Sequence, residues 1–157
     1  MATAMPAIDW EQEQEQDTFT PESCEDTAPT SSGRLLQSQR QELETEIRRA
    51  KSIPEIHGQE GLYSQETLDR AVAFLRMHVE RLWRSYGVRA PIPAIGPGPD
   101  GSVDIFWELA PWQLLVNIPA NPNALATFYG HDQRQQKTKG SVDSNTFSFS
   151  IAACLMT

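Results

Sequence analysis

The chain has 157 residues, and its formal net charge of −8 is confined to one end. Eight of its 21 acidic residues lie in residues 1–33, which contain no Lys or Arg, so residues 34–157 hold 13 acids against 13 bases. A neutral folded part with an acidic head lacks the basic surface typical of a nucleic-acid-binding protein. Nucleic acid is therefore not the expected partner.

The size of the chain indicates one domain over residues 34–157. A domain of this size buries about two-thirds of the surface of its unfolded chain, enough for a core without metal or disulfides. Cys24 and Cys154 lie in regions of opposite character, so we expect two free thiols in a reducing compartment. We expect no targeting segment and no membrane span, because the longest apolar runs have the length of a strand. The composition predicts a soluble cytoplasmic protein without a cofactor, and it leaves the oligomeric state open.

The acidic head, residues 1–33, is predicted to be a disordered tail. Its alternating Glu and Gln, with Thr, Ser and Pro, bury too little apolar surface to offset the entropy lost on ordering. Ile8, Trp10 and Phe19 interrupt this polar pattern. These three side chains fit either a short motif that orders on a partner or a solubilising tail with incidental aromatic residues.

Two helices are predicted before the strands. The first is a peripheral helix over residues 34–53, which we expect Pro54 and Gly58 to end. Its apolar residues recur at helical spacing but form a narrow stripe: Leu35, Leu36, Leu43 and Ile47. Such a stripe places the helix at the edge of the domain or on a partner.

The second predicted helix, residues 65–87 with its cap, is the core helix. Ser64 is a suitable N-cap, and Gly87 stands where a left-handed C-cap belongs. One broad apolar face comes from two rows and their neighbours: Leu68, Ala71, Val72, Leu75, Val79, Leu82, Trp83 and Tyr86. This pattern is typical of an amphipathic helix that faces a core.

The pattern changes after this helix. Residues 90–101 contain four prolines and three glycines, which predict an irregular connection that ends in a turn at residues 99–101. From residue 102 apolar side chains alternate with polar ones, as in strands. Three strands are expected: Ser102–Glu108, Gln113–Ile118 and about Ala126–Tyr129.

The C-terminal part is expected to hold a loop and one further strand. His131–Gly140 is wholly polar and predicts the loop. Thr146–Ser150 alternates Phe147 and Phe149 with small polar residues, which predicts a fourth strand. Ile151–Met156 fits either an extension of that strand or a short turn of helix.

Together these elements predict an α+β fold. The amphipathic helix of about residues 65–86 would pack on a three- to four-stranded antiparallel β-meander within residues 102–157. One face of this sheet is expected against the helix, and the other is expected to be partly exposed.

Four residues near one strand end are the candidates for catalysis. His131 and Asp132 follow the predicted strand 126–129, and Asp104 and Glu108 share one face of the predicted strand 102–108. A histidine with paired carboxylates can perform acid–base chemistry. Acidic residues are also ordinary on the solvent face of an antiparallel strand, so an enzyme is the alternative hypothesis.

Other catalytic patterns give no support. No two of the three histidines have a metal-ligand spacing, and no Cys-x-x-Cys occurs, so no metal site is predicted. Gly96, Gly98 and Gly101 match Gly-x-Gly-x-x-Gly, but they precede a predicted strand where a nucleotide-binding loop follows one. Cys154 lies in an apolar run, where a buried inert thiol is the normal expectation.

The main prediction is a small non-enzymatic protein-interaction or regulatory protein. An antitoxin, immunity protein, inhibitor or accessory subunit fits this description, and the product of a neighbouring gene is the first partner to test. It would bind through a sheet face or edge and through its tail, since large aromatic residues dominate binding surfaces. The residues expected at the interface are Trp107, Trp112, Phe106, Trp10 and Phe19, with core packing as the alternative for the strand tryptophans.

A third hypothesis is a nucleic-acid-binding regulator. The arginines of residues 65–89 would form its basic stripe, although Asp69 and Glu80 dilute the charge. Its binding would weaken steeply with salt.

Overall fold

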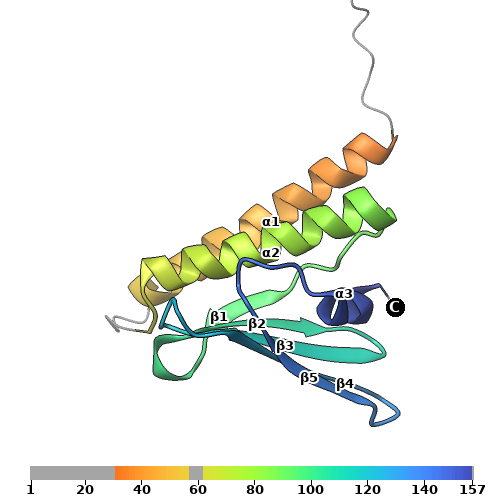
Figure 1. The fold of residues 1–157 in the computed structure, drawn as a ribbon. Coiled ribbons are helices and arrows are strands. Elements are labelled where there is room, and N and C mark those ends of the chain that lie inside the picture. The colour runs from red at the N-terminus through yellow and green to blue at the C-terminus, as the bar shows by residue number, and fades with distance from the viewer. Residues whose placement is uncertain (1–30, 57–61, 157) are drawn as a thin grey trace, which may run out of the picture.

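The computed structural model describes residues 31–56 and 62–156, which form two long helices, a five-stranded antiparallel sheet and a short C-terminal helix (Figure 1). The helices are α1 (Ser31–Ile56), α2 (Gln65–Tyr86) and α3 (Phe149–Leu155). The strands are β1 (Ala94–Pro97), β2 (Val103–Glu108), β3 (Trp112–Ile118), β4 (Ala126–Asp132) and β5 (Lys137–Val142). Neighbouring strands in the sheet are neighbours in sequence, so the sheet is a meander. The α+β prediction is confirmed, with more strands than the three or four expected.

The molecule has two layers. All three helices of the described residues lie on one face of the sheet, and none of them covers the opposite face (Figure 1). Within the described ranges no helix is both long and apolar enough to cross a bilayer. The described helices therefore leave one face of the sheet accessible.

Helix α2 has the predicted bounds and caps. Ser64 Oγ accepts a hydrogen bond from the Thr67 amide at 3.1 Å, and Gly87 closes the helix with φ of 65°. A residue with a side chain is strained at this φ, which explains the glycine. The buried face of α2 therefore begins and ends as its sequence pattern indicates.

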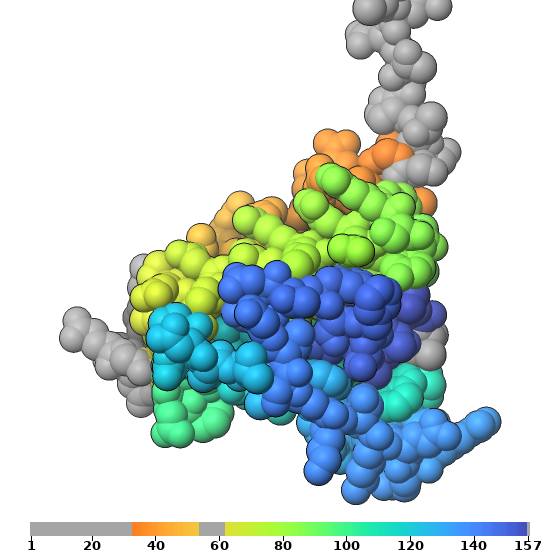
Figure 2. All heavy atoms as spheres, in the orientation of Figure 1, coloured from red at the N-terminus to blue at the C-terminus, as the bar shows by residue number. Residues whose placement is uncertain are grey.

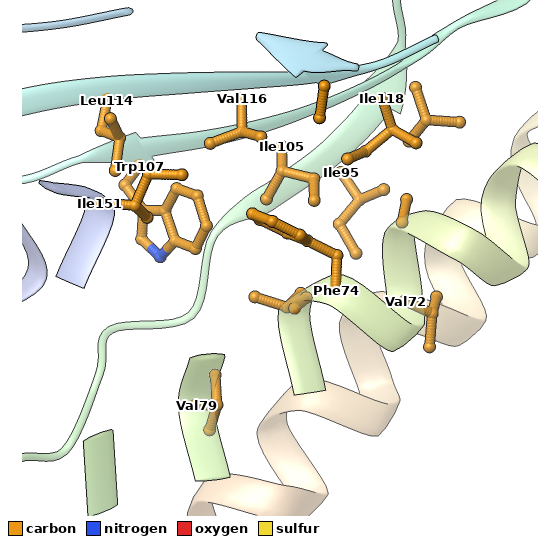
Figure 3. Packing of buried hydrophobic residues seen from close by; sticks show 14 of the residues in the cluster. Val72, Phe74, Val79, Ile95, Ile105, Trp107, Leu114, Val116, Ile118 and Ile151 are labelled. Atoms are coloured by element: carbon orange, nitrogen blue, oxygen red, sulfur yellow. The ribbon is translucent and has the colours of Figure 1, made fainter. Parts of the chain in front are cut away.

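The core lies between α2 and the covered face of the sheet (Figure 3). Phe74 points from α2 toward Ile105 and Ile95, and Ile151 of α3 closes one side near Trp107. These five side chains have at most 1% of their surface exposed. Strict alternation along β2 puts Val103, Ile105 and Trp107 in this core, as the period of two predicts.

Helix α1 extends further than predicted. It begins at Ser31 and continues past Pro54 to Ile56, so the expected end at Pro54 is wrong. Proline has no amide hydrogen to bond the carbonyl of Ala50 four residues earlier. The Tyr63 hydroxyl donates to that carbonyl at 2.6 Å, which compensates the missing bond. The helix packs against α2 and β1, at the edge of the domain.

Strand β1 corrects the prediction of an irregular segment over residues 90–101. Ala94 and Gly96 stand opposite Phe106 and Asp104 of β2, and the amide of Gly98 bonds the carbonyl of Ser102 at 2.9 Å. Hydrogen-bonded pairs alternate along an antiparallel ladder, so this bond shows which backbone groups of β1 pair with β2. The backbone groups of even-numbered residues bond β2, and those of odd-numbered residues point away from it. The prolines of this segment are all odd-numbered, and their missing amides therefore cost β1 no ladder bond. The turn at residues 99–101 is confirmed as a 3-10 turn.

The polar segment His131–Gly140 is also not the predicted loop. Strand β4 runs on to Asp132, a tight turn follows, and β5 begins at Lys137. The Asp132 carboxylate holds the turn by accepting the amides of Arg134 at 2.9 Å and Gln136 at 2.7 Å. The polar composition of this segment suits β5, because an edge strand is solvated on more than one side.

The last element is a helix, and the predicted strand Thr146–Ser150 is wrong. Ser148 is the N-cap of α3, and its hydroxyl accepts the Ile151 amide at 3.4 Å. The helical alternative for Ile151–Met156 is confirmed. Four buried residues at helical spacing attach α3 to the core: Ile151, Ala152, Cys154 and Leu155.

The predicted disordered tail falls mostly outside the described residues. Residues 31–33 belong to α1, so the boundary at residue 33 is too late. Trp10 and Phe19 lie outside the described residues, as does Gly58.

Candidate functional site

The uncovered side of the sheet, here called the open face, carries one apolar row. Cross-strand pairing places Ala94, Phe106, Leu115 and Tyr129 side by side across β1 to β4. Lys139 of β5 ends the row. Tyr129 is 41% exposed, and Phe106 and Leu115 are partly exposed. Large apolar side chains thus lie in line on a surface that no helix covers.

A polar row runs along one side of the apolar row. Its members are Gly96, Asp104, Asn117, Thr127 and Ser141. Asn117 Nδ2 donates to Asp104 Oδ1 at 2.7 Å and to Ser102 Oγ at 2.7 Å. A Cβ on Gly98 would come within 2.4 Å of this hydroxyl, so only glycine allows the turn to lie over the network. This part of the face is rich in hydrogen-bonding groups.

A second polar row runs along the other side. Glu108, Gln113, His131 and Lys137 follow one another across β2 to β5. The His131 ring lies beside the Tyr129 ring, with centroids 5.8 Å apart. The open face therefore has an apolar centre between two polar borders, the arrangement typical of protein interfaces.

The surface is hollowed on both sides of Leu115. One hollow of about 660 Å³ lies toward β1, where Arg49 and Ile53 of α1 overhang the edge of the sheet. The other, of about 480 Å³, lies toward β5 and is lined by Tyr129 and Lys139. Leu115 is a shared rim, so a partner that engages this face meets a ridge between two depressions.

The four catalytic candidates do not form one site. His131 and Glu108 lie on the open face in the same row, with Gln113 between them. Asp132 lies on the opposite side of β4, is 8% exposed, and is occupied by the amides of its own turn. Asp104 lies in the other polar row, hydrogen-bonded to Asn117.

His131, Glu108 and Asp132 line a hollow of about 270 Å³ beside the β2–β3 turn. Among the described residues no carboxylate hydrogen-bonds or ion-pairs with His131, and its Nδ1 is buried without a partner. No group of three or more His, Cys, Asp or Glu in the described part of the chain is placed to hold a metal. Of the three acid–base residues in this small open hollow, Asp132 is already held by the amides of its own turn, so the enzyme hypothesis has little geometric support.

The three aromatic candidates of β2 and β3 lie in different environments. Trp107 is fully buried, and its indole donates to the Pro91 carbonyl at 2.9 Å, so it is core and not an interface residue. Trp112 is partly buried on the helix-covered side and packs against the core. Phe106 alone lies on the open face. Sequence reasoning missed Leu115 and Tyr129, although Leu115 shares one face of β3 with the polar residues Gln113 and Asn117, two positions away on either side.

The arginines of the α2 region are mostly engaged within the protein. Arg70 donates to the Pro119 and Ala120 carbonyls, and Arg81 lies 5.1 Å from the Phe147 ring. Arg76 and Arg89 pair with glutamates of α1, and Arg84 approaches Glu80 at 3.7 Å. Charges used in this way form a poor stripe for phosphates.

One edge of the sheet is closed by α1. The Ile95 amide donates to Glu46 at 2.7 Å, and Arg49 donates to the Ile95 carbonyl at 2.7 Å. Burial alone would raise the pKa of Glu46, but hydrogen bonds from Arg49 and the Ile95 amide outweigh it and hold this pKa below its ordinary value. The two side chains thus take the place of a sixth strand beside β1.

No family model, curated protein or solved structure matches this chain. What the protein does must therefore be argued from the open face and its surroundings.

Proposed function

We propose that this protein is a non-enzymatic interaction or regulatory protein that binds a protein partner through the open face of its sheet. It acts in the manner of an antitoxin, immunity protein, inhibitor or accessory subunit. The cytoplasm is the proposed compartment, and the product of a neighbouring gene is the first partner to test.

The observation that carries the proposal is the apolar row Phe106, Leu115 and Tyr129, which the three described helices leave uncovered because they lie on the other side of the sheet. A sheet face with no role in binding needs no line of large apolar side chains across three strands. Such a row stabilises a complex when a partner removes it from water, at about 25 cal/mol per Å² of apolar area. Contiguous apolar surface with a polar border is typical of an interaction site.

The partner that fits presents apolar side chains to the two hollows beside Leu115. It also presents hydrogen-bonding groups to the polar rows, which include Asp104, Asn117 and Gln113. These polar groups give the complex its orientation, and the apolar row gives most of its stability.

The test compares affinity capture by three full-length proteins: the parent, Leu115→Glu and Leu35→Glu. Leu35 is a 48% exposed leucine of α1, so the second variant carries the same change of charge and volume away from the open face. A protein that the parent captures is identified, purified and titrated against all three.

The proposal predicts that Leu115→Glu weakens this affinity at least about 30-fold, since a desolvated charge at an interface centre costs 2 kcal/mol or more. Leu35→Glu should bind like the parent. Equal binding by all three proteins would contradict the open face as the interface.

A further inference from the structure

Strand β5 leaves the second edge of the sheet open. The amide of Asp132 bonds the carbonyl of Gln136 at 3.0 Å, which fixes the alternation along the β4–β5 hairpin. Thr138 and Gly140 therefore bond β4, and the backbone groups of Lys137, Lys139 and Ser141 point outward.

Nothing in the described ranges covers these outward groups. The hairpin projects from the body of the molecule (Figure 2), and Lys137, Lys139 and Ser141 are exposed. Strand β1 differs on each point, because Pro93 and Pro97 have no outward amide and α1 binds the outward groups of Ile95. An open row of backbone donors and acceptors is a template for an added strand.

The charge on this edge selects its occupant. Lys137 and Lys139 lie on the same side of β5, two residues apart, and Arg134 lies in the adjoining turn. A second copy that paired edge to edge would place lysines opposite or near lysines, which is destabilising. An extended acidic segment would place carboxylates there instead.

The chain contains such a segment. Residues 11–17 read Glu-Gln-Glu-Gln-Glu-Gln-Asp, with an acid at every second position. In a strand, side chains two apart share a face, so all four acids would lie on one side. In one register of pairing with β5, these acids stand directly opposite the lysines. A shift of the register by one residue would put glutamines opposite them.

We infer that residues 11–17 add to β5 of the same chain as a sixth strand, with their acids opposite Lys137 and Lys139. The sheet is then closed at both edges, at β1 by α1 and at β5 by the acidic segment. The inference concerns an edge and not the open face, so it does not rest on the proposed function.

The length of the connection permits this contact. Residues 18–30 join the segment to α1, and 13 extended residues span about 44 Å. The 26 residues of α1 extend only about 39 Å. The connection can therefore span more than the full length of α1.

The test uses amide hydrogen exchange of the full-length protein, resolved by residue. The variant Gln12→Glu, Glu13→Gln, Glu15→Gln, Gln16→Glu reads Glu-Glu-Gln-Gln-Gln-Glu-Asp over residues 11–17, so charge and composition are kept and no two acids remain two positions apart. The inference predicts that the outward amides of Lys137, Lys139 and Ser141 exchange about tenfold faster in this variant than in the parent. The inward amides of Thr138 and Gly140 should not change, which provides a control within the same strand.

A charge reversal supplies the second test. Lys137→Glu with Lys139→Glu should release the segment and speed exchange of its own amides at residues 12–16. Adding Glu13→Lys and Glu15→Lys to that variant should restore protection, because the opposite charges again face each other.

Equal exchange of the outward amides in the parent and the rearranged variant would overturn the inference. Protection that grows with protein concentration, together with a doubled mass in sedimentation, would also overturn it in favour of exchange between copies. In either case, capture of a partner by the parent and its loss in Leu115→Glu would be unaffected, so the two proposals fail separately.

Discussion

Phe106 and Trp107 are neighbours in the chain and belong to opposite faces of the same strand. Trp107 is fully buried under the helices, whereas Phe106 lies on the open face between Ala94 and Leu115. On the covered face apolar side chains have found partners within the chain. On the open face, equally apolar side chains are left uncovered by the described helices. The free energy of burying them remains available to a complex. Stability and binding are therefore assigned to different faces, which makes them separable by substitution.

The largest difference between the faces should appear on truncating these two neighbours. Trp107→Ala is expected to lower the free energy of unfolding by about 3–5 kcal/mol, because it opens a cavity in the core and leaves the Pro91 carbonyl without its donor. Phe106→Ala should cost about 1 kcal/mol or less, since its side chain is already partly in water. Urea unfolding at neutral pH measures both, and equal losses would remove the distinction.

A second expected effect concerns the edge that α1 closes. Glu46→Ala should lower the free energy of unfolding by about 1–2 kcal/mol, because it removes the acceptor of the Ile95 amide and frees Arg49. Glu44→Ala on the same helix breaks only an exposed pair with Arg76 and should cost less than about 1 kcal/mol. Since the pKa of Glu46 is depressed in the folded protein, its contribution is present above its ordinary value of 4.5 and lost as pH falls below it. A loss for Glu46→Ala no greater than for Glu44→Ala would show that the edge is not held by this clamp.

The covered face should also respond to acid through His78. Its Nδ1 bonds the Phe74 carbonyl at 2.9 Å, and its Nε2 accepts the Ser148 amide at 3.0 Å, so the buried ring is neutral. Burial lowers the pKa of His78 below its ordinary value of 6.5, and the hydrogen bond to Phe74 offsets this only in part.

As pH falls below 6.5, the unfolded chain binds a proton at His78 that the folded protein does not. Stability should fall by up to about 1.4 kcal/mol per pH unit down to the folded pKa. Urea unfolding at several values between pH 7.5 and 5.5 measures this slope. It should disappear in His78→Gln and persist in His131→Gln on the open face, and a slope that survives in His78→Gln would assign the proton elsewhere.

The smallest effect on stability is expected at the β5 edge of the sheet. Lys137→Ala with Lys139→Ala should change the free energy of unfolding by less than about 0.5 kcal/mol, because both side chains are exposed. Charges on an edge strand oppose pairing with other chains, so self-association should increase. Sedimentation of the parent and the variant compares this, and an unchanged distribution of mass would mean that the lysines do not protect the edge.

The parts of the fold that could be predicted are those with strong periodicity. Helix α2 combines a broad apolar face with the caps Ser64 and Gly87, and β2 alternates strictly, so local pattern and burial agree. The pattern around Phe147 and Phe149 misled because it has the period of a strand. Phe147 stacks on His78, whereas Phe149 is 65% exposed on α3, so the two rings do not share a sheet face.

The two edge strands were missed because an edge strand needs fewer buried apolar residues and fewer backbone hydrogen bonds than a central strand, and these are the features that identify a strand. In and around β1 the prolines occupy positions whose backbone points away from β2, where a missing amide is harmless. Their spacing at odd-numbered positions was the feature of the sequence that could have indicated a strand. In β5 neither face is fully buried, so its residues look like a loop. Of the open face, Phe106 was identified in advance. Leu115 and Tyr129 were not, since a strand's apolar residues are expected in the core until its partner strands are known.

Methyl-resolved NMR of the protein during titration with its captured partner tests directly whether the open face is the binding surface. Leu115 and Val116 are consecutive in β3, and Val116 is fully buried under the helices while Leu115 lies on the open face. Binding through the open face predicts that the Leu115 methyl signals shift or broaden and saturate, while those of Val116 move little. Shifts confined to residues of the helical layer, with Leu115 unchanged at saturation, would contradict it.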